Sequence, residues 1–313
     1  MIYNNELLRQ TEQKFSELRR KAESKPEYYR SVLNENADYI RIQNELGTAK
    51  LELAKAEYTG DSLKLSAFNA KIADLNAEKN KLLKKLNIKE IDLTPKYFCK
   101  KCNDTGYTYD GKKCRCFYKT LYGFALTNLG INIPLLPDFS QAKFFEKNNL
   151  LKIYAVFKKY CEKFPILNGK KNALFSGPSG VGKSFLAGCI ANEIIKKDCS
   201  VIYLTSFELN TVLLKYHLAP PEDKNLYSDI LTGCDLLVID DLGTEPILKN
   251  VTSEYLLMII SERISKGNPY IITTNLNQEE LISRYSERFF SRINDKKNTA
   301  YLTISGEDLR RII

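Results

Sequence analysis

The feature that most restricts the fold of this chain is a glycine-rich loop, Gly177-Pro178-Ser179-Gly180-Val181-Gly182-Lys183-Ser184, which fits the pattern G-x-x-x-x-G-K-[ST]. Small residues let successive backbone N–H groups point inward at a phosphate, and a helix that starts near Gly182 adds its positive N-terminal end. In such a loop Lys183 reaches the β- and γ-phosphates, and the Ser184 hydroxyl ligates Mg²⁺. We therefore predict an ATP-binding protein of the P-loop class.

Strand-like and helix-like segments alternate from Asn172 onwards. An apolar run precedes the phosphate loop, a helical stretch over 184–197 follows it, and further apolar runs rich in β-branched residues come later. The expected strands are 173–176, 201–205, 236–239, 270–273 and 301–304. Such alternation predicts an α/β fold with a mainly parallel sheet covered by helices.

Two of these expected strands end in polar residues that suit phosphate chemistry. One ends at Asp240 and Asp241, and another is followed by Asn275. Parallel strands deliver their carboxyl ends to the ligand-binding edge of a sheet. Asp240 would hold Mg²⁺ through water, Asp241 would orient or deprotonate the attacking water, and Asn275 would hydrogen-bond that water or the γ-phosphate. Taken singly, two acids and an Asn after strands are ordinary capping and turn residues, so these roles depend on the phosphate loop.

These three motifs, in this order and spacing, resemble the AAA+ ATPases. The segment 284–293 then resembles the part of that family that carries an arginine finger, which reaches the γ-phosphate bound to a neighbouring subunit. Arg292 is the first candidate for the finger and Arg288 the second; they lie four residues apart, on one helical face. The alternative is a solvated basic face. The segment 305–311 places Arg310 at the position called sensor 2 in this family.

The same closing segment resembles the bacterial DnaC/DnaI helicase loaders and the related IstB transposition ATPases. Because the sequence ends at Ile313, soon after the last expected strand, we expect no C-terminal helical lid. Many AAA+ proteins carry Asp-Glu where this chain has Asp240-Asp241, so we expect slow hydrolysis that suits a switch, with Glu245 as a less favoured base. The resemblance implies a replicative hexameric helicase and single-stranded DNA as partners, and an ATP-dependent homo-oligomer.

Residues 1–94 differ from the rest in composition and pattern, with a high density of charge, no cysteine and apolar residues at helical spacing. We predict two or three amphipathic helices in a hairpin or short coiled coil, interrupted at Lys25-Pro26 and at 59–61. The segment is interpreted either as a bundle or dimerisation element, or as a docking region for a protein partner. The expected organisation continues with a cysteine module over 95–120, a linker and lead-in helix over 121–170, and the ATPase domain over 171–313.

Four of the eight cysteines lie close together, in the pattern C-x₂-C…C-x-C. They are Cys99, Cys102, Cys114 and Cys116. We predict a structural zinc site with four thiolate ligands, because the only histidine, His217, lies far away in the sequence. An iron–sulfur cluster and a redox role are the alternatives. The basic residues around the cluster would offset its negative charge. They are Lys100, Lys101, Lys112, Lys113 and Arg115.

Charge and hydropathy set limits on location and partners. The formal net charge of +9 favours an anionic partner without proving one. By resemblance, the insertion between Phe207 and Cys234 faces single-stranded DNA, with Lys215 and Tyr216 as the candidate phosphate and stacking contacts; an ordinary amphipathic helix is the alternative. The N-terminus lacks a signal-peptide pattern, and no apolar run is long enough to cross a bilayer, so we expect a cytoplasmic protein without a membrane partner.

The leading prediction is an ATP-dependent helicase loader that acts in the initiation of DNA replication and uses slow ATP hydrolysis as a switch. The helical front end and cysteine module favour this function over that of an IstB-like transposition helper. A third alternative, from a different class, is a non-catalytic adaptor that binds ATP and holds other proteins together. A measured rate of ATP hydrolysis would distinguish an enzyme from an adaptor.

Overall fold

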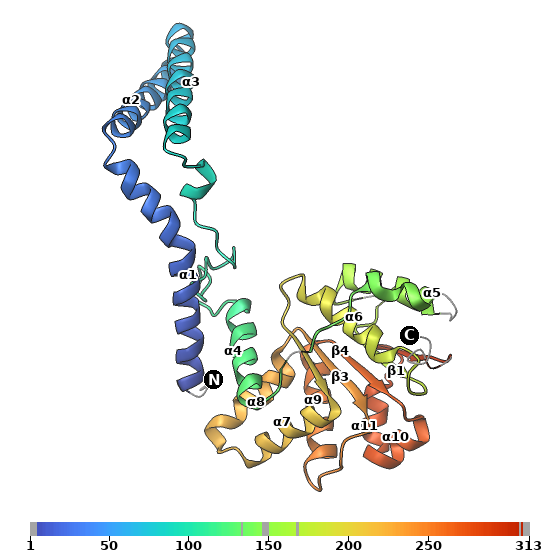
Figure 1. Ribbon diagram of the computed structural model, residues 1–313. Coiled ribbons are helices and arrows are strands. Elements are labelled where there is room, and N and C mark those ends of the chain that lie inside the picture. The colour runs from blue at the N-terminus through green and yellow to red at the C-terminus, as the bar shows by residue number, and fades with distance from the viewer. Residues whose placement is uncertain (1–4, 133, 146–149, 167–168, 307, 309–313) are drawn as a thin grey trace. The chain divides into compact units, whose positions relative to one another are not determined.

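The computed structural model describes residues 5–132, 134–145, 150–166, 169–306 and 308. The chain divides into two compact units (Figure 1). One unit comprises residues 13–110, and the other comprises residues 1–12 together with 111–313. No helix in these described ranges is long and apolar enough to span a membrane.

The unit of residues 13–110 is helical, as predicted. Its regular elements are the greater part of α1 (Asn5–Asn34), α2 (Ala37–Thr59), α3 (Ser62–Lys85) and the short 3₁₀ helix η1 (Glu90–Leu93). The predicted interruption at Lys25-Pro26 is wrong, because α1 continues through Pro26 to Asn34. A proline removes only one hydrogen bond from a helix, and the turns on both sides of Pro26 hold this long helix together.

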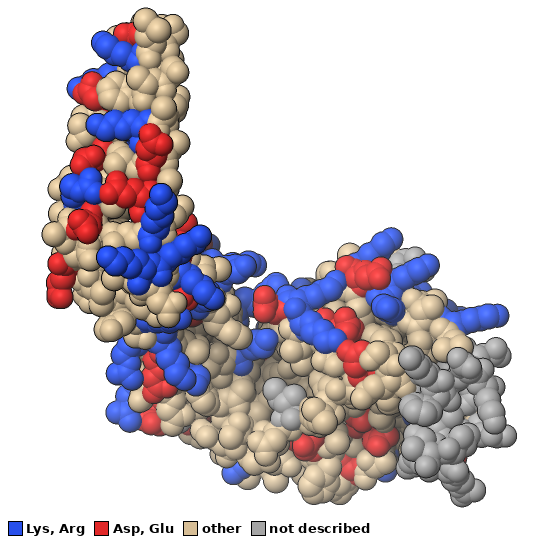
Figure 2. Space-filling model, turned by 45° about the horizontal axis from the view of Figure 1, so that its top comes forward, with Lys and Arg blue, Asp and Glu red and all other residues tan. Residues whose placement is uncertain are grey.

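Helices α2 and α3 form an antiparallel hairpin whose turn follows the predicted signals. Gly60 ends α2 in the left-handed conformation, with φ of 70°, and the Asp61 side chain accepts the Lys64 N–H at the start of α3. The buried contact between the two helices is built on Ile42 and Leu46 of α2 and Leu75 of α3. Acidic and basic side chains alternate along the outside of the hairpin (Figure 2), as the high charge density of this segment implies.

The other unit contains a five-stranded sheet in which every neighbouring pair is parallel. The strands are β1 (Asn172–Ser176), β2 (Val201–Thr205), β3 (Leu236–Leu242), β4 (Tyr270–Thr274) and β5 (Thr299–Thr303). Their order across the sheet is β2-β3-β4-β1-β5. The predicted α/β fold with a parallel sheet is confirmed, and every predicted strand is present. Strands β1 and β4 are buried along their whole length, which explains their unbroken apolar runs.

Helices cover both faces of this sheet (Figure 1). The helices of this unit are α4 (Arg115–Asn128), η2 (Phe139–Phe145), α5 (Leu150–Lys163), α6 (Lys183–Ile195), α7 (Ser206–Leu218), α8 (Pro221–Gly233), α9 (Thr252–Lys266), α10 (Gln278–Tyr285) and α11 (Glu287–Ile293). On one face, α5 and α6 bury Phe157 and Ile190 against alternate strand residues such as Phe175 and Val238. The lead-in helix expected within 121–170 is α5.

At the opposite edge from the phosphate loop, a fully buried arginine ties helices to strands. The Arg263 guanidinium on α9 donates to the carbonyl oxygens of Leu231 at 2.7 Å, Cys234 at 3.0 Å and Pro269 at 2.5 Å. Leu231 lies in the last turn of α8, whereas Cys234 and Pro269 belong to the connections that lead into β3 and β4. This contact could not be predicted from the sequence, since a lone arginine in an amphipathic helix is normally exposed.

The strand order explains how distant motifs come together. The phosphate loop leaves the carboxyl end of β1, Asn275 follows β4, and Asp240 lies near the end of β3. Because β1, β4 and β3 are consecutive neighbours in the sheet, their carboxyl ends share one edge. This edge, called here the phosphate end of the sheet, carries the candidate site.

Candidate functional site

The phosphate loop connects β1 directly to α6, as predicted, and close backbone approach explains its first glycine. Gly177 has φ of 144°, and a Cβ atom there would lie 2.0 Å from the carbonyl oxygen of Ile304, so any other residue would collide with the backbone. At Gly180, an added Cβ would lie 1.9 Å from Oδ1 of Asp308. A carboxylate oxygen therefore already lies against this loop, which fits a loop whose N–H groups attract anions.

Lys183 is buried at the start of α6 and its side chain folds back towards the loop. Its Nζ donates to the carbonyl oxygens of Gly177 and Pro178, both at 2.7 Å, and to Oδ1 of Asn275 at 2.6 Å. The structure therefore brings together two candidate residues that are far apart in the sequence. To reach a bound phosphate, the Lys183 ammonium group would exchange some of these neutral acceptors for phosphate oxygens, which form stronger charge-assisted hydrogen bonds.

Asp240 is held by hydroxyl groups from both neighbouring strands. Tyr203 of β2 donates from Oη to Oδ2 at 2.8 Å, and Thr273 of β4 donates from Oγ1 to Oδ1 at 2.5 Å. Burial, followed by the charge of Asp240, raises the pKa of the Tyr203 hydroxyl above its ordinary value, so Tyr203 stays a donor at neutral pH. Each carboxylate oxygen keeps a second lone pair. Asp240 can therefore still accept a hydrogen bond from water bound to Mg²⁺.

Tyr203 also links Asp240 to the helix that carries the other predicted magnesium ligand. Its hydroxyl lies 3.5 Å from the backbone carbonyl oxygen of Ser184, in the first turn of α6. Ser184 and Asp240 thus lie on either side of one tyrosine hydroxyl. A hydrated Mg²⁺ ion keeps several waters and takes few direct protein ligands, so two such residues would be enough to hold it.

Asp241 occupies an irregular position in its strand. Its φ of 54° is left-handed, and the register between β3 and β4 shifts between Ile239 and Leu242. The Asp241 N–H donates to Thr273 Oγ1 at 2.9 Å, while its carbonyl oxygen accepts from Ser206 at 2.9 Å. Bulges of this kind often redirect a side chain next to an active site. The backbone is fixed, and the half-buried carboxylate stands at the phosphate end of the sheet.

Glu245 is engaged in structural contacts. Its side chain is buried, and its two carboxylate oxygens accept hydrogen bonds from the Gly243 N–H at 2.9 Å and from the Tyr285 hydroxyl. Arg284 donates to the Glu245 carbonyl oxygen. A general base needs an accessible lone pair within reach of water. These contacts favour Asp241 over Glu245 as the candidate base.

The candidate arginine fingers are exposed on the surface of α11. Both Arg288 and Arg292 point into solvent, and neither forms an ion pair within the described ranges. The backbone carbonyl of Arg292 accepts from the Tyr270 hydroxyl at 3.3 Å, which fixes the helix against β4. Exposed guanidinium groups on a fixed helix suit a role in a neighbouring subunit. Arg310, the sensor 2 candidate, lies outside the described residues.

The two candidate DNA contacts are neighbours on α7 but differ in environment. Lys215 is exposed, whereas Tyr216 is half-buried. The Tyr216 ring packs edge-on against Tyr255 with 4.9 Å between centroids, and its hydroxyl lies 4.0 Å from the Met258 sulfur. Much of the ring is therefore used in packing between α7 and α9. Base stacking needs a free ring face, so this geometry favours Lys215 over Tyr216 as a contact for nucleic acid.

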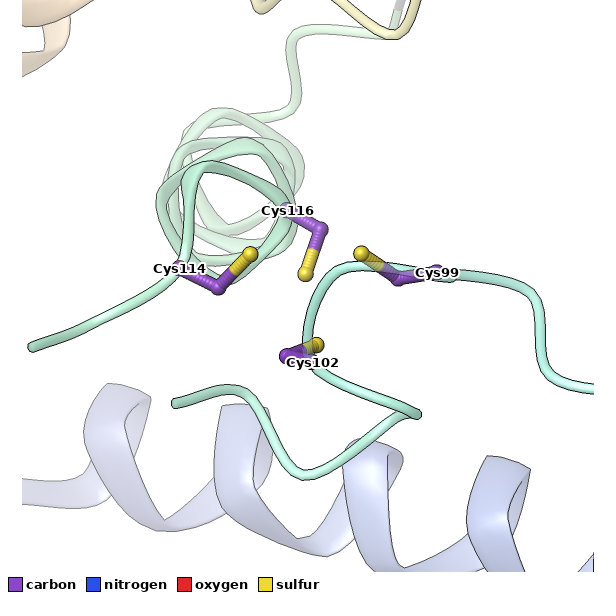
Figure 3. Close-up of side chains that lie close together, drawn as sticks. All are labelled: Cys99, Cys102, Cys114 and Cys116. Atoms are coloured by element: carbon purple, nitrogen blue, oxygen red, sulfur yellow. The ribbon is translucent and has the colours of Figure 1, made fainter. Parts of the chain in front are cut away.

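The four clustered cysteines converge as predicted. Their sulfur atoms all lie within 4.8 Å of one another and point towards a common centre (Figure 3). Cys114 is the N-cap of α4 and Cys116 lies in its first turn, where the helix dipole favours thiolates. The carboxylate of Asp104 is buried and accepts the N–H groups of Phe98 at 2.9 Å and Cys99 at 2.8 Å, which shapes the first half of the cluster.

The donor set of this cluster fits a structural zinc ion. Four sulfur ligands in a closed arrangement are typical of Zn²⁺, although iron–sulfur clusters use the same set. His217 lies on α7, where its Nδ1 is 2.8 Å from the Tyr255 hydroxyl, so it is not a member. The remaining cysteines are buried, and burial raises the pKa of Cys161 and of Cys189 to about 12, which keeps them as thiols.

Reasoning from the sequence missed Tyr203 and the hydroxyl role of Thr273. Both lie in strands adjacent to β3, near the ends that share an edge with Asp240. The sequence does place a hydroxyl residue near the carboxyl end of each strand that flanks β3. These two residues could be recognised as partners of Asp240 only if the strands that pair with β3 were already known.

Comparison with known proteins agrees with this geometry. Residues 161–293 match the family model described as IstB-like ATP binding protein. Over 121 residues, the chain is 31% identical to the replicative helicase loader DnaC of Escherichia coli K12, which covers 38% of this chain and 49% of that protein. The replicative helicase loader DnaI of Bacillus subtilis is 31% identical over 127 residues, covering 38% of this chain and 39% of that protein.

The chain is also similar to an insertion-sequence protein and to a solved structure of a helicase loader. A putative insertion sequence ATP-binding protein of Sinorhizobium fredii is 30% identical over 153 residues, covering 46% of this chain and 59% of that protein. A crystal structure of the DnaC helicase loader superimposes with a TM-score of 0.42 at 27% identity, covering 52% of this chain and all of that one. The chain spans about half the length of the curated relatives it matches. From the motifs and these matches together, residues 161–293 form an IstB-like ATP-binding domain, and the chain is similar to the replicative helicase loaders DnaC and DnaI.

Proposed function

We propose that this protein is an ATP-dependent helicase loader that binds the replicative hexameric helicase and single-stranded DNA in the initiation of DNA replication. One observation carries the proposal. Lys183, Asn275 and Asp240 meet at one sheet edge, in a chain whose relatives include proteins named replicative helicase loaders. An ATP-binding fold alone would suit many functions, and the names of the relatives select this one.

ATP would bind with its phosphates in the loop 177–184. Lys183 would transfer its hydrogen bonds to the β- and γ-phosphates, and Ser184 and Asp240 would hold Mg²⁺, which neutralises the charge that develops on the phosphates. Asp241 would orient or deprotonate the attacking water, and Asn275 would position it. Aspartate is one methylene shorter than the glutamate that many AAA+ proteins carry here, so hydrolysis would be slow and would act as a timed switch.

Arg292 would complete the site of a neighbouring subunit, with Arg288 as the second candidate and Arg310 at the sensor 2 position. The exposed position of Arg292 on a fixed helix supports this role. A finger supplied by another copy makes the active form a homo-oligomer whose contacts depend on ATP. Residues 1–94 would dock on the helicase, and Lys215 would contact single-stranded DNA in the assembly.

Binding of the helicase and of ATP tests this proposal. The full-length protein is mixed with the replicative helicase of the same organism, with and without Mg·ATP, and the complex is followed by size-exclusion chromatography. The matched variants are Lys183→Ala and Lys159→Ala, the latter an exposed lysine on α5. We expect Lys183→Ala to weaken Mg·ATP binding about a hundredfold, as loss of charge-assisted hydrogen bonds implies, and Lys159→Ala to bind normally. A wild type that binds Mg·ATP but never the helicase would refute the loader.

A transposition helper remains the second candidate, because the family model and one relative point to insertion-sequence ATP-binding proteins. The two functions differ in the protein that the ATP-bound form captures. Stable capture of a transposase encoded near the gene, without capture of the helicase, would select the second. If wild type and Lys183→Ala release phosphate equally slowly with DNA and partner present, neither enzyme description holds, and a non-catalytic adaptor is the better description.

A further inference from the structure

The unit of residues 13–110 contains a groove of about 300 Å³ that takes no part in nucleotide chemistry. One wall is α1, and the other is the segment 91–98, which follows the hairpin and is called here the strap. The α1 wall offers Leu18, Ala22 and Pro26. These residues are spaced four apart, so they form one apolar face of the helix.

The strap is fastened to α1 along its length, so the groove exists before any partner binds. Lys25 forms an ion pair with Asp92 at 2.9 Å, and Tyr97 donates from its hydroxyl to Glu23 at 2.9 Å. Between them, the Arg30 guanidinium donates to the carbonyl oxygen of Leu93 at 2.9 Å. A preformed groove loses little conformational entropy when a ligand enters, which favours binding.

Pro26 contributes to the groove in a second way. A proline inside a helix has no N–H to donate to the carbonyl four residues earlier, which here belongs to Ala22. Both residues line the groove. The Ala22 carbonyl oxygen therefore receives no hydrogen bond from residue 26, and this polar group stands beside the apolar face.

Two large apolar side chains of the strap are exposed at this groove. Ile91 is 60% exposed and Phe98 is 70% exposed, and both line the groove. Single exposed apolar residues are common on protein surfaces. Two of them beside an apolar depression make a contiguous patch, which is the usual mark of a protein-binding surface.

The charged groups at the rim of the groove that face solvent are basic. The two acids that line it are engaged, Asp92 with Lys25 and Asp104 with two backbone N–H groups. Lys21 and Lys96 also line it, are exposed, and form no ion pair within the described ranges. The outward-facing charge is therefore basic, and it complements an acidic ligand.

We propose that this groove takes a short amphipathic segment of the partner protein, with a large apolar side chain between α1 and the strap and acidic residues opposite Lys21 and Lys96. The proposal rests on the helicase loader function, which supplies the partner. A nucleic acid fits less well, because phosphates are normally tracked by a row of cations and bases by stacked rings. Here the floor is aliphatic and carries the carboxylate of Asp92.

Two variants of the full-length protein test the groove. Phe98→Ser removes the exposed anchor, and the double variant Lys21→Glu with Lys96→Glu reverses the rim charge. Each has a matched control in the other unit, outside residues 1–94: Leu135→Ser for the apolar change and Lys159→Glu with Lys163→Glu for the charge change, since Leu135 and both lysines are exposed. The probe is the replicative helicase of the same organism, and Kd is measured by calorimetry with Mg·ATP present.

We expect each groove variant to raise the Kd by about tenfold or more, and each control to stay within about twofold. Circular dichroism should show the same helix content in all five proteins, because every altered side chain is exposed. If Phe98→Ser alone lost helix content, the double variant would carry the test.

The outcomes separate the groove from the function on which it rests. If the wild type binds the helicase and the groove variants bind it equally well, the groove proposal is overturned while the loader function stands. If the wild type does not bind the helicase, both are overturned. A parallel titration uses labelled oligothymidylate of about 20 nucleotides. Loss of oligonucleotide binding in the double variant, with helicase binding intact, would assign the groove to nucleic acid and overturn the proposal.

Discussion

The phosphate end of the sheet and the cysteine cluster hold their chemical groups in different ways. At the phosphate end, Lys183 and Asp240 are fixed by protein donors and acceptors on adjacent strands and loops. In the cysteine cluster the sulfur atoms lie within 4.8 Å of one another, and thiolates at such distances repel unless a cation lies between them. The first site is therefore preformed by the fold, whereas the second depends on its ligand.

Metal removal should give the largest effect and the sharpest contrast between the two regions. Structural zinc sites contribute an apparent free energy of about 10–16 kcal/mol, so we expect Cys102→Ser to lose bound zinc and the structure around Asp104. Mg·ATP binding should persist, because the phosphate end does not use the metal. Metal analysis, hydrogen exchange at residues 97–106 and calorimetry with Mg·ATP measure the three quantities.

The matched control for the cysteine change is Cys199→Ser, which alters a thiol outside the cluster. Burial raises the pKa of Cys199, so it remains a thiol, and the variant should retain its zinc. Full zinc content in Cys102→Ser would contradict the predicted ligand set. Visible absorption and bound iron in freshly purified protein would show that the four cysteines hold an iron–sulfur cluster and not zinc.

The second-largest effect is expected from substitution of the arginine finger, and it tests whether the phosphate end is complete within one chain. Arginine fingers contribute about 10³ to 10⁵ in turnover, so Arg292→Ala should abolish measurable ATP hydrolysis while Mg·ATP still binds. Arg288→Ala, on the same helix, should retain more activity. Phosphate release in the presence of helicase and single-stranded DNA is the measurement.

Mixing two inactive variants shows where the finger acts. Arg292→Ala supplies an intact phosphate loop, and Lys183→Ala supplies an intact finger, so a mixed oligomer regains activity if the finger acts between subunits. No recovery on mixing would mean that Arg292 acts within its own chain. Full activity in both Arg288→Ala and Arg292→Ala would assign both arginines to the solvated surface.

The comparison also explains what the sequence could predict. The phosphate loop and the Asp240 strand are contiguous motifs, and the rule that parallel strands share a carboxyl edge was enough to bring them together. Tyr203 could not be found in this way, because its contact with Asp240 depends on which strand pairs with β3. The buried Arg263 escaped for the same reason, since its partners are backbone carbonyls that carry no sequence signal.

In the helical unit, predictions from local sequence patterns failed for another reason, because contacts between distant segments decide the structure. Pro26 was expected to end a helix, but the length of α1 and its contacts with the strap override one lost hydrogen bond. The groove itself is formed by residues about 70 positions apart in the chain, which no periodicity reveals. The cysteine cluster was predictable because its spacing alone limits the ligands.

Removing the hydroxyl of Tyr203 should give a smaller effect and test how far the phosphate end is preformed. Tyr203→Phe keeps the ring but removes the donor to Asp240. Because a hydrogen bond to a charged group contributes about 1.5–3 kcal/mol, we expect the Mg²⁺ concentration needed for half-maximal hydrolysis to rise about tenfold. Tyr160→Phe is the control, since its buried hydroxyl donates to the Lys171 carbonyl oxygen. An unchanged Mg²⁺ requirement in Tyr203→Phe would mean that Thr273 alone positions the carboxylate.

The smallest predicted effect lies in the helical unit, at the exposed contact that fastens the strap. The hydrogen bond from Lys25 lowers the pKa of Asp92 below its ordinary value. A carboxyl group with a lowered folded pKa stabilises the fold fully above the unfolded pKa of about 3.9, and that contribution is lost as pH falls through the lower folded value. A carboxyl titration by NMR should therefore find the midpoint of Asp92 below the ordinary range, and Lys25→Met should return it there. An ordinary midpoint in the wild type would show that the ion pair is not populated in solution, and that the strap depends on Tyr97 and Arg30 instead.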